Sequence, residues 1–419
     1  MVYVKPFQGI RPQSGLAKEV SALPYDVMNR QEAAEMAAGK ENSILHITRA
    51  EIDFPAEVGD YDDRVYAKAR ENLDRFLAAG VLNREEKPVY YIYRETMNGI
   101  SQTGIVAVVA VSDYKNDIIM KHELTRKEKE QDRIRHFAAC DCQTEPIFLT
   151  YRHQKSIEEI MEQWSKTHNT VYDFISEDDI RHQLWVIDDD AAINALEKNF
   201  VALPKMYIAD GHHRTASAAA ICELKAKAGV LKPEDPANYI MAVIFPDTDL
   251  NIMAYHRIVK APENFDFSDF ETYLKSYFTI SEITEDFPDM PNRQFGLYWE
   301  HKWYHLIAED RLYKSERTAD NLDAAVLQKY ILAPYFSIDD PRTDPRIDFI
   351  GGIRGRKEIQ RRCDEENCIG IYMSPVSIHD LMAVADQGQI MPPKSTWFEP
   401  KLRSGLFLHS FSANEGETK

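Results

Sequence analysis

A short apolar strand, a sharp turn and an alanine-rich helix follow one another directly in YIADGHHRTASAAA, Tyr207–Ala220. Glycine lets the chain turn tightly at Asp210-Gly211, and the first turn of a helix has backbone N–H groups without an intrahelical acceptor. Such a helix start attracts anions, and phosphate in particular. Three basic side chains, His212, His213 and Arg214, oppose the helix dipole in the same turn. The segment therefore predicts an α/β chain with an anion site here, although Asp210 could simply cap the helix above a surface turn.

Strands and helices alternate from about Asp117 to Tyr255, which predicts a mixed α/β (α+β) sheet with covering helices. We expect an N-terminal domain over residues 1–260 and a smaller α+β C-terminal domain over 261–419 that contributes loops to the site. Helices are expected at Asn29–Ala38, Tyr61–Ala79, Ile157–Trp164, Ala191–Lys198, Gly211–Ala228, Ser268–Tyr277 (started by a Ser268/Glu271 capping box), Leu322–Tyr330, Lys357–Arg362 and Ile378–Ala385. Strands are expected at Val89–Tyr93, Gly104–Val111 (a hairpin turned at Asn98-Gly99), Ile118–Met120, Ile147–Thr150, Met206–Ile208, Asn238–Phe245, Leu250–Tyr255, Phe295–Trp299 and Trp303–Ile307.

The charge of the chain argues against a nucleic-acid partner. Its net charge is −18, whereas binding along a phosphate backbone needs a concentrated basic surface. The N-terminus lacks the pattern of a signal peptide, and no apolar run reaches the ~18 residues of a membrane span. We therefore expect a cytoplasmic protein without a membrane partner, and a homodimer as the default assembly. The five cysteines lack paired zinc spacing, which predicts reduced thiols: Cys140, Cys142, Cys222, Cys363 and Cys368.

A second polar segment, MKHELTRKEKEQDR, Met120–Arg133, follows a predicted strand. Its later part fits an ordinary charged helix with opposite charges one turn apart, such as Arg126 and Glu130. His122 and Glu123 precede that helix, at the strand end, where a carboxylate can serve as general base or metal ligand. The sequence leaves both interpretations open, and it excludes an H-E-x-x-H zinc motif.

Two C-terminal segments combine glycine turns with basic side chains: DDPRTDPRIDFIGGIRG, Asp339–Gly355, and MPPKSTWFEPKLRSGL, Met391–Leu406. Such turns suit phosphate or carboxylate binding, although neither matches a P-loop. The alternative is an irregular, well-packed segment that ties the domains together. The candidate substrate-binding residues here are Lys394, Ser395, Thr396 and Arg403.

Several strings resemble the family catalogued as domain of unknown function 1015, over essentially the whole chain. They are KPFQGIRP, ALPYDV, HELTRKEKEQDR, YIADGHHRTASA, DPRTDPRIDFIGGIRG and MPPKSTWFEPKLRSGL. A strand ending in His-Glu, followed later by strand–DGHHR–helix, also resembles the ParB/sulfiredoxin-like nucleotide-binding fold over about residues 117–255. The chain has His212 where sulfiredoxin has its cysteine, and it shows no helix-turn-helix of the ParB type. Both departures favour small-molecule chemistry.

Among these relatives, the ParB-like free serine kinases imply a phosphotransferase that uses ATP or ADP with Mg²⁺. Glu123 then fits the general base, and Asp210 and His213 complete the catalytic set, with Asp210 as the Mg²⁺ ligand. The phosphate-binding set implied is Gly211, His212, His213, Arg214 and Thr215, and the substrate-binding set adds His122, Arg126, Lys394, Ser395, Thr396 and Arg403. Two alternatives remain: a nucleotide or metabolite sensor without chemistry, and a metal-dependent hydrolase with Asp210, His212 and His213 as ligands.

Overall fold

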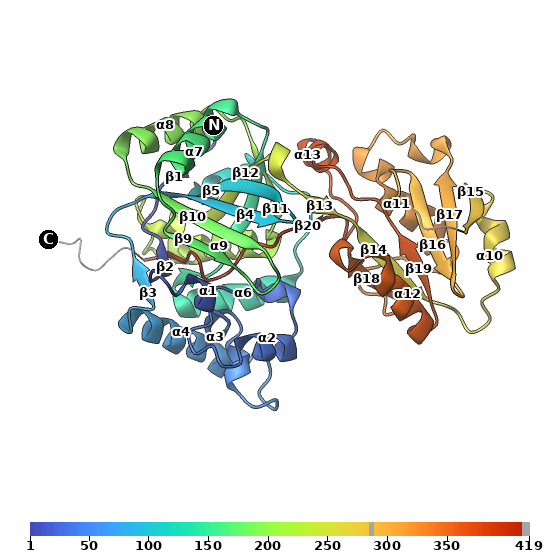
Figure 1. Ribbon diagram of the computed structural model, residues 1–419, viewed down its shortest axis with the longest axis horizontal. Helices are drawn as coiled ribbons and strands as arrows, with labels where there is room; N and C mark the ends of the chain where they lie inside the picture. The colour runs from blue at the N-terminus through green and yellow to red at the C-terminus, as the bar shows by residue number, and fades with distance from the viewer. Residues whose placement is uncertain (285–288, 413–419) are drawn as a thin grey trace. The chain divides into compact units, whose positions relative to one another are not determined.

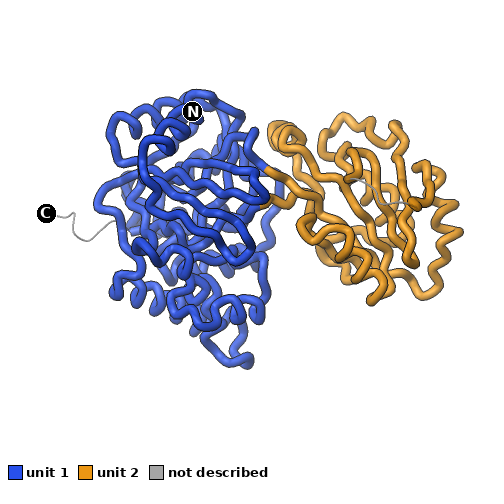
Figure 2. The backbone as a smooth tube through the Cα atoms, viewed as in Figure 1, with its two compact units in different colours: residues 1–250, 400–419 blue, residues 251–399 orange. Residues whose placement is uncertain are grey.

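The computed structural model describes residues 1–284 and 289–412, and the chain divides into two compact units (Figure 2). Unit 1 consists of Met1–Leu250 together with the chain from Pro400 onward, and unit 2 consists of Asn251–Glu399. The boundary therefore lies ten residues before the expected position near 260. The return of the chain to unit 1 was not expected, and its cause is apolar burial: Phe407 and Leu408 are 0% exposed.

Unit 1 is built on a mixed sheet that comprises nine strands within the described residues, in the order β6-β11-β8-β12-β5-β4-β10-β9, with β1 paired to β5. The pairs β11–β6 and β12–β8 are parallel, and the other pairs are antiparallel. The strands are β1 (Val4–Lys5), β4 (Tyr90–Met97), β5 (Ile100–Ala110), β6 (Ile119–Met120), β8 (Ile147–Tyr151), β9 (Tyr172–Ile175), β10 (Arg181–Ile187), β11 (Met206–Asp210) and β12 (Tyr239–Pro246).

Two apolar strands, β5 and β12, lie at the centre of this sheet, and almost every side chain of β12 is buried. The hairpin expected at Asn98-Gly99 joins β4 to β5, and both turn residues have positive φ. The strands β9 and β10 were not expected from the sequence.

Helices cover both sides of the sheet in unit 1, with α7 and α8 on one side and α4 and α6 on the other (Figure 1). The last helix, α9, packs along α6. The α-helices are α1 (Ala17–Val20), α2 (Arg30–Ala37), α3 (Leu45–Thr48), α4 (Asp63–Ala78), α5 (Val111–Lys115), α6 (Lys127–Cys140), α7 (Lys155–Thr167), α8 (Asp190–Val201) and α9 (His212–Lys227). Short 3₁₀ turns lie at Tyr25–Val27, Ala50–Asp53, Pro236–Asn238 and Asp247–Asp249, and the small strand pairs are β2 (Ile10–Pro12) with β3 (Leu82–Arg84) and β7 (Cys142–Gln143) with β21 (His409–Ser410).

Unit 2 is a separate α+β unit built on an antiparallel sheet with strand order β15-β17-β16-β19-β14-β18. Its strands are β13 (Ile252–Met253), β14 (Tyr255–Lys260), β15 (Phe278–Ile283), β16 (Gln294–Trp299), β17 (Lys302–Ala308), β18 (Ile347–Gly351), β19 (Cys368–Tyr372) and β20 (Trp397–Phe398), which pairs with β13. Its helices are α10 (Phe267–Leu274), α11 (Asp323–Leu327), α12 (Gly355–Glu366) and α13 (Ile378–Asp386), with 3₁₀ turns at Asp310–Tyr313, Thr318–Asn321 and Gly352–Arg354 and a π-turn at Gln328–Leu332.

Three local predictions in this region differ from the structure. The expected capping box at Ser268 is wrong, because Asp266 caps α10 and accepts a hydrogen bond from the Ser268 N–H at 2.7 Å. The expected strand Leu250–Tyr255 is divided between β13 and β14. The helix expected over Leu322–Tyr330 changes from α to π winding after Leu327. No helix among the described residues combines the length and apolar character needed to cross a membrane.

Candidate functional site

The turn between β11 and α9 is formed by Gly211, whose φ is +93°. Its N–H donates to the Asp210 carboxylate at 2.9 Å, and no side chain of the described residues caps the helix. A Cβ at this position would lie 3.2 Å from Arg214 Nε. The alternative in which Asp210 caps α9 is therefore wrong, because Asp210 bonds the turn itself and not the helix.

The first turn of α9 provides amide groups but is mostly buried. The first backbone bond of the helix runs from the Thr215 N–H to the Gly211 carbonyl at 2.9 Å, so the N–H groups of residues 212–214 precede the helical ladder. Thr215 is fully buried, and its hydroxyl also donates to the Gly211 carbonyl. His213 is the most exposed side chain of this turn, and burial lowers its pKa.

Asp210 lies between two cations. Lys401 Nζ is 3.5 Å and Arg214 Nη2 is 3.8 Å from its carboxylate. Burial disfavours the charge, but the Lys401 ammonium and the Arg214 guanidinium outweigh burial and hold the pKa of Asp210 well below its usual range. The carboxylate is thus ionised at neutral pH, as a cation ligand must be.

Arg214 is held by the protein itself and is 3% exposed. Its Nη1 donates to the Pro146 carbonyl, and its Nη2 lies 4.0 Å from the Asp26 carboxylate. Its Nε has no hydrogen-bond partner among the described residues. The guanidinium is therefore held by contacts within the protein, and its Nε is the donor that has no partner among the described residues.

A buried polar cluster that the sequence analysis missed surrounds this guanidinium. The Arg133 guanidinium stacks 4.0 Å over the ring of Tyr25, and the Tyr25 N–H donates to Glu145 at 3.0 Å. Within the described residues, one polar atom of each of these three side chains lacks a hydrogen-bond partner: Tyr25 OH, Arg133 Nη1 and Glu145 Oε2. A buried polar atom without a partner calls for a water, ion or ligand. Tyr25 lies in ALPYDV and Arg133 lies in HELTRKEKEQDR, two of the strings that resemble the DUF1015 family. Their joint presence in one family was the only sequence signal that could have linked these two residues.

His122 and Glu123 meet the start of α9 because β6 and β11 are parallel neighbours. Residues that follow parallel strands leave the sheet at the same edge. Glu123 Oε2 lies 3.9 Å from His212 Nδ1, and the His122 N–H lies 3.5 Å from His212 Nε2, 90 residues along the chain. The structure thus brings together the two segments that the sequence marked separately.

Four further candidates come from the start of α6 and from unit 2. Arg126 is the exposed N-cap residue of α6. Lys394, Ser395 and Thr396 belong to unit 2, where the Ser395 hydroxyl donates to the Pro392 carbonyl and the Lys394 carbonyl accepts from Arg257. Their role at a substrate site stays a prediction.

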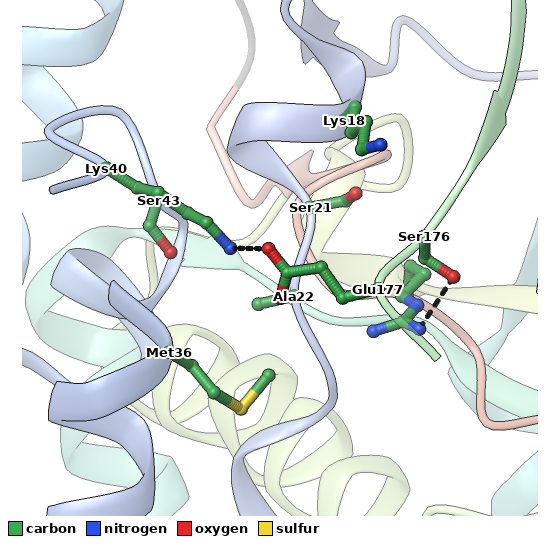
Figure 3. A pocket seen from close by; sticks show the side chains of 9 residues that line it. Lys18, Ser21, Ala22, Met36, Lys40, Ser43, Ser176 and Glu177 are labelled. Atoms are coloured by element: carbon green, nitrogen blue, oxygen red, sulfur yellow. Dashed lines mark hydrogen bonds and ion pairs between the residues drawn. The ribbon is translucent and has the colours of Figure 1, made fainter. Parts of the chain in front are cut away.

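Arg403 lines a pocket of unit 1 in which Lys40 pairs with Glu177 (Figure 3). Its guanidinium pairs with Asp178 and donates to the Ser176 hydroxyl at 3.0 Å. Both contacts are made by Nη2, and Nε donates to His182 Nε2 at 3.3 Å, so a role of Arg403 at a substrate site stays a prediction. The pocket is lined by Lys18, Ser21, Ala22, Met36, Lys40, Ser43, Ser176, Glu177 and Arg403.

Residues 4–325 match the family model described as protein of unknown function (DUF1015). The chain belongs to this family. None of the curated proteins matches it. Among solved structures, a free serine kinase in complex with AMP is 13% identical, with 73% of this chain and 91% of that chain covered and a TM-score of 0.37. A conserved hypothetical protein from Pyrococcus furiosus is 14% identical, with 73% and 95% covered and a TM-score of 0.35. SbnI with a C-terminal truncation, from Staphylococcus aureus, is 13% identical, with 73% and 87% covered and a TM-score of 0.40.

Proposed function

We propose that this DUF1015 member is a nucleotide-dependent phosphotransferase that acts on a small hydroxylated compound, with free L-serine as the first acceptor to test. The observation that carries the proposal is the placement of the half-exposed Glu123 carboxylate 3.9 Å from His212, in the amide-rich first turn of α9. An anion site and a candidate general base thus lie at one sheet edge. Phosphoryl transfer needs this positioning and charge neutralisation more than covalent catalysis.

The donor phosphates of ATP or ADP would bind at the N-terminus of α9. The N–H groups of residues 212–214 and the His213 side chain supply hydrogen-bond donors there. Mg²⁺ would be held by the ionised Asp210 together with phosphate oxygens, as is usual for this ion. Lys401 would neutralise further charge, since it already lies 3.5 Å from Asp210.

The acceptor would place its hydroxyl against Glu123, which orients it and removes its proton. A carboxylate on the acceptor would be bound through Nη1 of Arg133, because the Nε and Nη2 of this side chain already pair with Asp132 at 2.9 and 2.8 Å. Arg133 Nη1 is buried and has no hydrogen-bond partner in the described part of the chain, so it can donate to such a ligand without losing an existing bond.

The first prediction concerns the base. Glu123→Gln keeps the size of the side chain but removes its basicity, so turnover should fall by about 10²–10⁴-fold. Affinity for the nucleotide should change little, since the amides of α9 are untouched. The measurement is ³¹P NMR of the product formed from ATP or ADP with L-serine, together with calorimetric titration of the nucleotide.

Glu128→Gln is the matched control, because Glu128 is an exposed carboxylate on α6 only five residues away. It should retain full activity. An equal loss of turnover and nucleotide affinity in Glu123→Gln would contradict the base role. Saturable nucleotide binding without phosphorylation of any amino acid or hydroxy acid would contradict transfer and favour a sensor.

A further inference from the structure

A cluster of metal-ligand side chains lies at the edge where β6 and β11 end. His122, Glu123 and His212 each offer one ligand atom, and these atoms lie within 4.8 Å of one another. We propose that these three residues bind a divalent first-row transition-metal ion of the Zn²⁺, Mn²⁺ or Fe²⁺ type. This ligand set replaces the one expected from the sequence for a hydrolase, because it joins His212 to His122 and Glu123 instead of Asp210 and His213.

His122 is the strongest indication of a ligand. Its side chain is 2% exposed, yet neither ring nitrogen has a hydrogen-bond partner among the described residues. The ring packs edge-on against His212, with centroids 4.5 Å apart. Buried imidazoles normally bond through at least one nitrogen. This ring leaves both unused, and one of them lies within 4.8 Å of ligand atoms of His212 and Glu123.

The geometry needs only a small contraction. Metal–nitrogen and metal–oxygen distances of about 2.0–2.2 Å put ligand atoms roughly 3–3.5 Å apart. The Glu123 side chain is 49% exposed and can approach by a rotamer change. The contact from the His122 N–H to His212 Nε2 is 3.5 Å, at the outer limit of a hydrogen bond, so turning the His212 ring costs little.

Ligand chemistry selects the class of ion. Imidazole suits Zn²⁺, Fe²⁺ and related ions, whereas Mg²⁺ prefers oxygen ligands and retained water. Two histidines and one carboxylate leave positions open, as in catalytic rather than structural sites. This site goes beyond the proposed phosphotransferase. Glu123 cannot act as a free base while it binds the ion, so metal binding and phosphoryl transfer are tested separately.

The test is calorimetric titration of the chelator-treated full chain with Zn²⁺, without nucleotide. We expect one ion per chain and a rise in unfolding temperature. His122→Ala and Glu123→Ala should each weaken binding by at least about 10–100-fold, the loss that even an outer partner of a ligand causes. If His122→Ala does not fold, Glu123→Ala still tests the site, because the Glu123 side chain is half-exposed and its removal should not disturb the core. His153→Ala, which removes a surface histidine 2.7 Å from Glu158, is the matched control and should bind as the wild type does.

Three outcomes would overturn the site: absence of saturable binding, affinity unchanged in Glu123→Ala, and displacement of Zn²⁺ by equimolar Mg²⁺. Because no nucleotide is present, failure of this test leaves the transferase proposal intact. Loss of transferase activity in Glu123→Gln with Mg²⁺ alone, conversely, leaves the metal site intact.

Discussion

At the scale of single residues, Gly211 meets two constraints that together only glycine satisfies. Its φ of +93° is unfavourable for a side chain, and the space where a Cβ would lie is bordered by the Arg214 guanidinium. The same guanidinium faces Asp210 and Asp26. The absence of a Cβ at Gly211 therefore permits both the tight turn and the position of the Arg214 guanidinium between the two aspartates.

The corresponding prediction is that Gly211→Ala costs more than its backbone strain. A non-glycine residue with positive φ costs about 1–2 kcal/mol. At Gly211 the methyl group would also meet Arg214 Nε at 3.2 Å and displace the guanidinium. The free energy of unfolding should therefore fall by more than about 2 kcal/mol, measured by urea denaturation of the full chain.

Gly229→Ala serves as the control at the other end of α9. Its φ is +69°, and a Cβ there would meet nothing within 4 Å. It should show only the backbone cost. Equal losses at the two positions would mean that Arg214 yields without penalty and that the coupling is absent.

At the scale of elements, the sequence predicted those helices and turns whose conformation depends on residues close together in the chain. The hairpin at Asn98-Gly99 and the helix after Gly211 were predicted because turn chemistry and an alanine-rich run act over a few residues. The strands β9 and β10 were missed, although VYDFI and HQLWVI carry the β-branched and aromatic side chains that are typical of strands. The pairing of β6 with β11 depends on the whole sheet, so no short segment encodes it.

The candidate site divides in the same way. Asp210, Gly211 and Glu123 were identified from motifs that lie within single segments. The grouping of Tyr25, Arg133 and Glu145 depends on three segments that fold together. The contact of Arg403 with Asp178 joins residues 225 positions apart, so no short segment encodes it. Motifs within one segment therefore mark single candidate residues, whereas their grouping with other segments becomes visible only in the folded chain.

The segment after Pro400 allows an element-scale prediction. Phe407 is fully buried against Tyr91 and Tyr93, with ring centroids 5.5 and 5.6 Å away. Phe407→Ala should therefore destabilise unit 1 by about 3–5 kcal/mol. Hydrogen exchange followed by mass spectrometry should show faster exchange in β4 and β5.

Phe295→Ala is the reciprocal control, because Phe295 is fully buried in the core of unit 2. Its effect should appear in β16 and β17 instead. Faster exchange in unit 2 after Phe407→Ala would show that the final segment does not stabilise unit 1 specifically.

At the scale of the whole molecule, depressed histidine pKa values are distributed unevenly between the units. Six of these histidines lie in unit 1 and one lies in unit 2, and burial is the largest cause for each. Among the described residues, burial also raises the pKa of two carboxyl groups in unit 1, Asp113 and Asp249, and of one in unit 2, Asp323. On acidification the buried histidines lower the free energy of unfolding, whereas carboxyl groups with a raised pKa increase it. Unit 1 has more buried histidines than such carboxyl groups, and unit 2 does not.

Unit 1 should therefore lose stability before unit 2 when the pH falls from 7.5 to 5. A buried histidine that titrates at about 4, such as His136 or His409, stays neutral in the folded chain while the unfolded chain binds a proton near 6.5. Stability falls wherever the unfolded state binds more protons as the pH decreases, which here spans pH 6.5 down to about 4. Each such histidine then costs roughly 1–2 kcal/mol by pH 5. Hydrogen exchange at both pH values, corrected for intrinsic rates, should show protection lost first in β4, β5 and β12, with β16 and β19 little changed. Equal loss of protection in the two units would show that the buried histidines do not control acid stability.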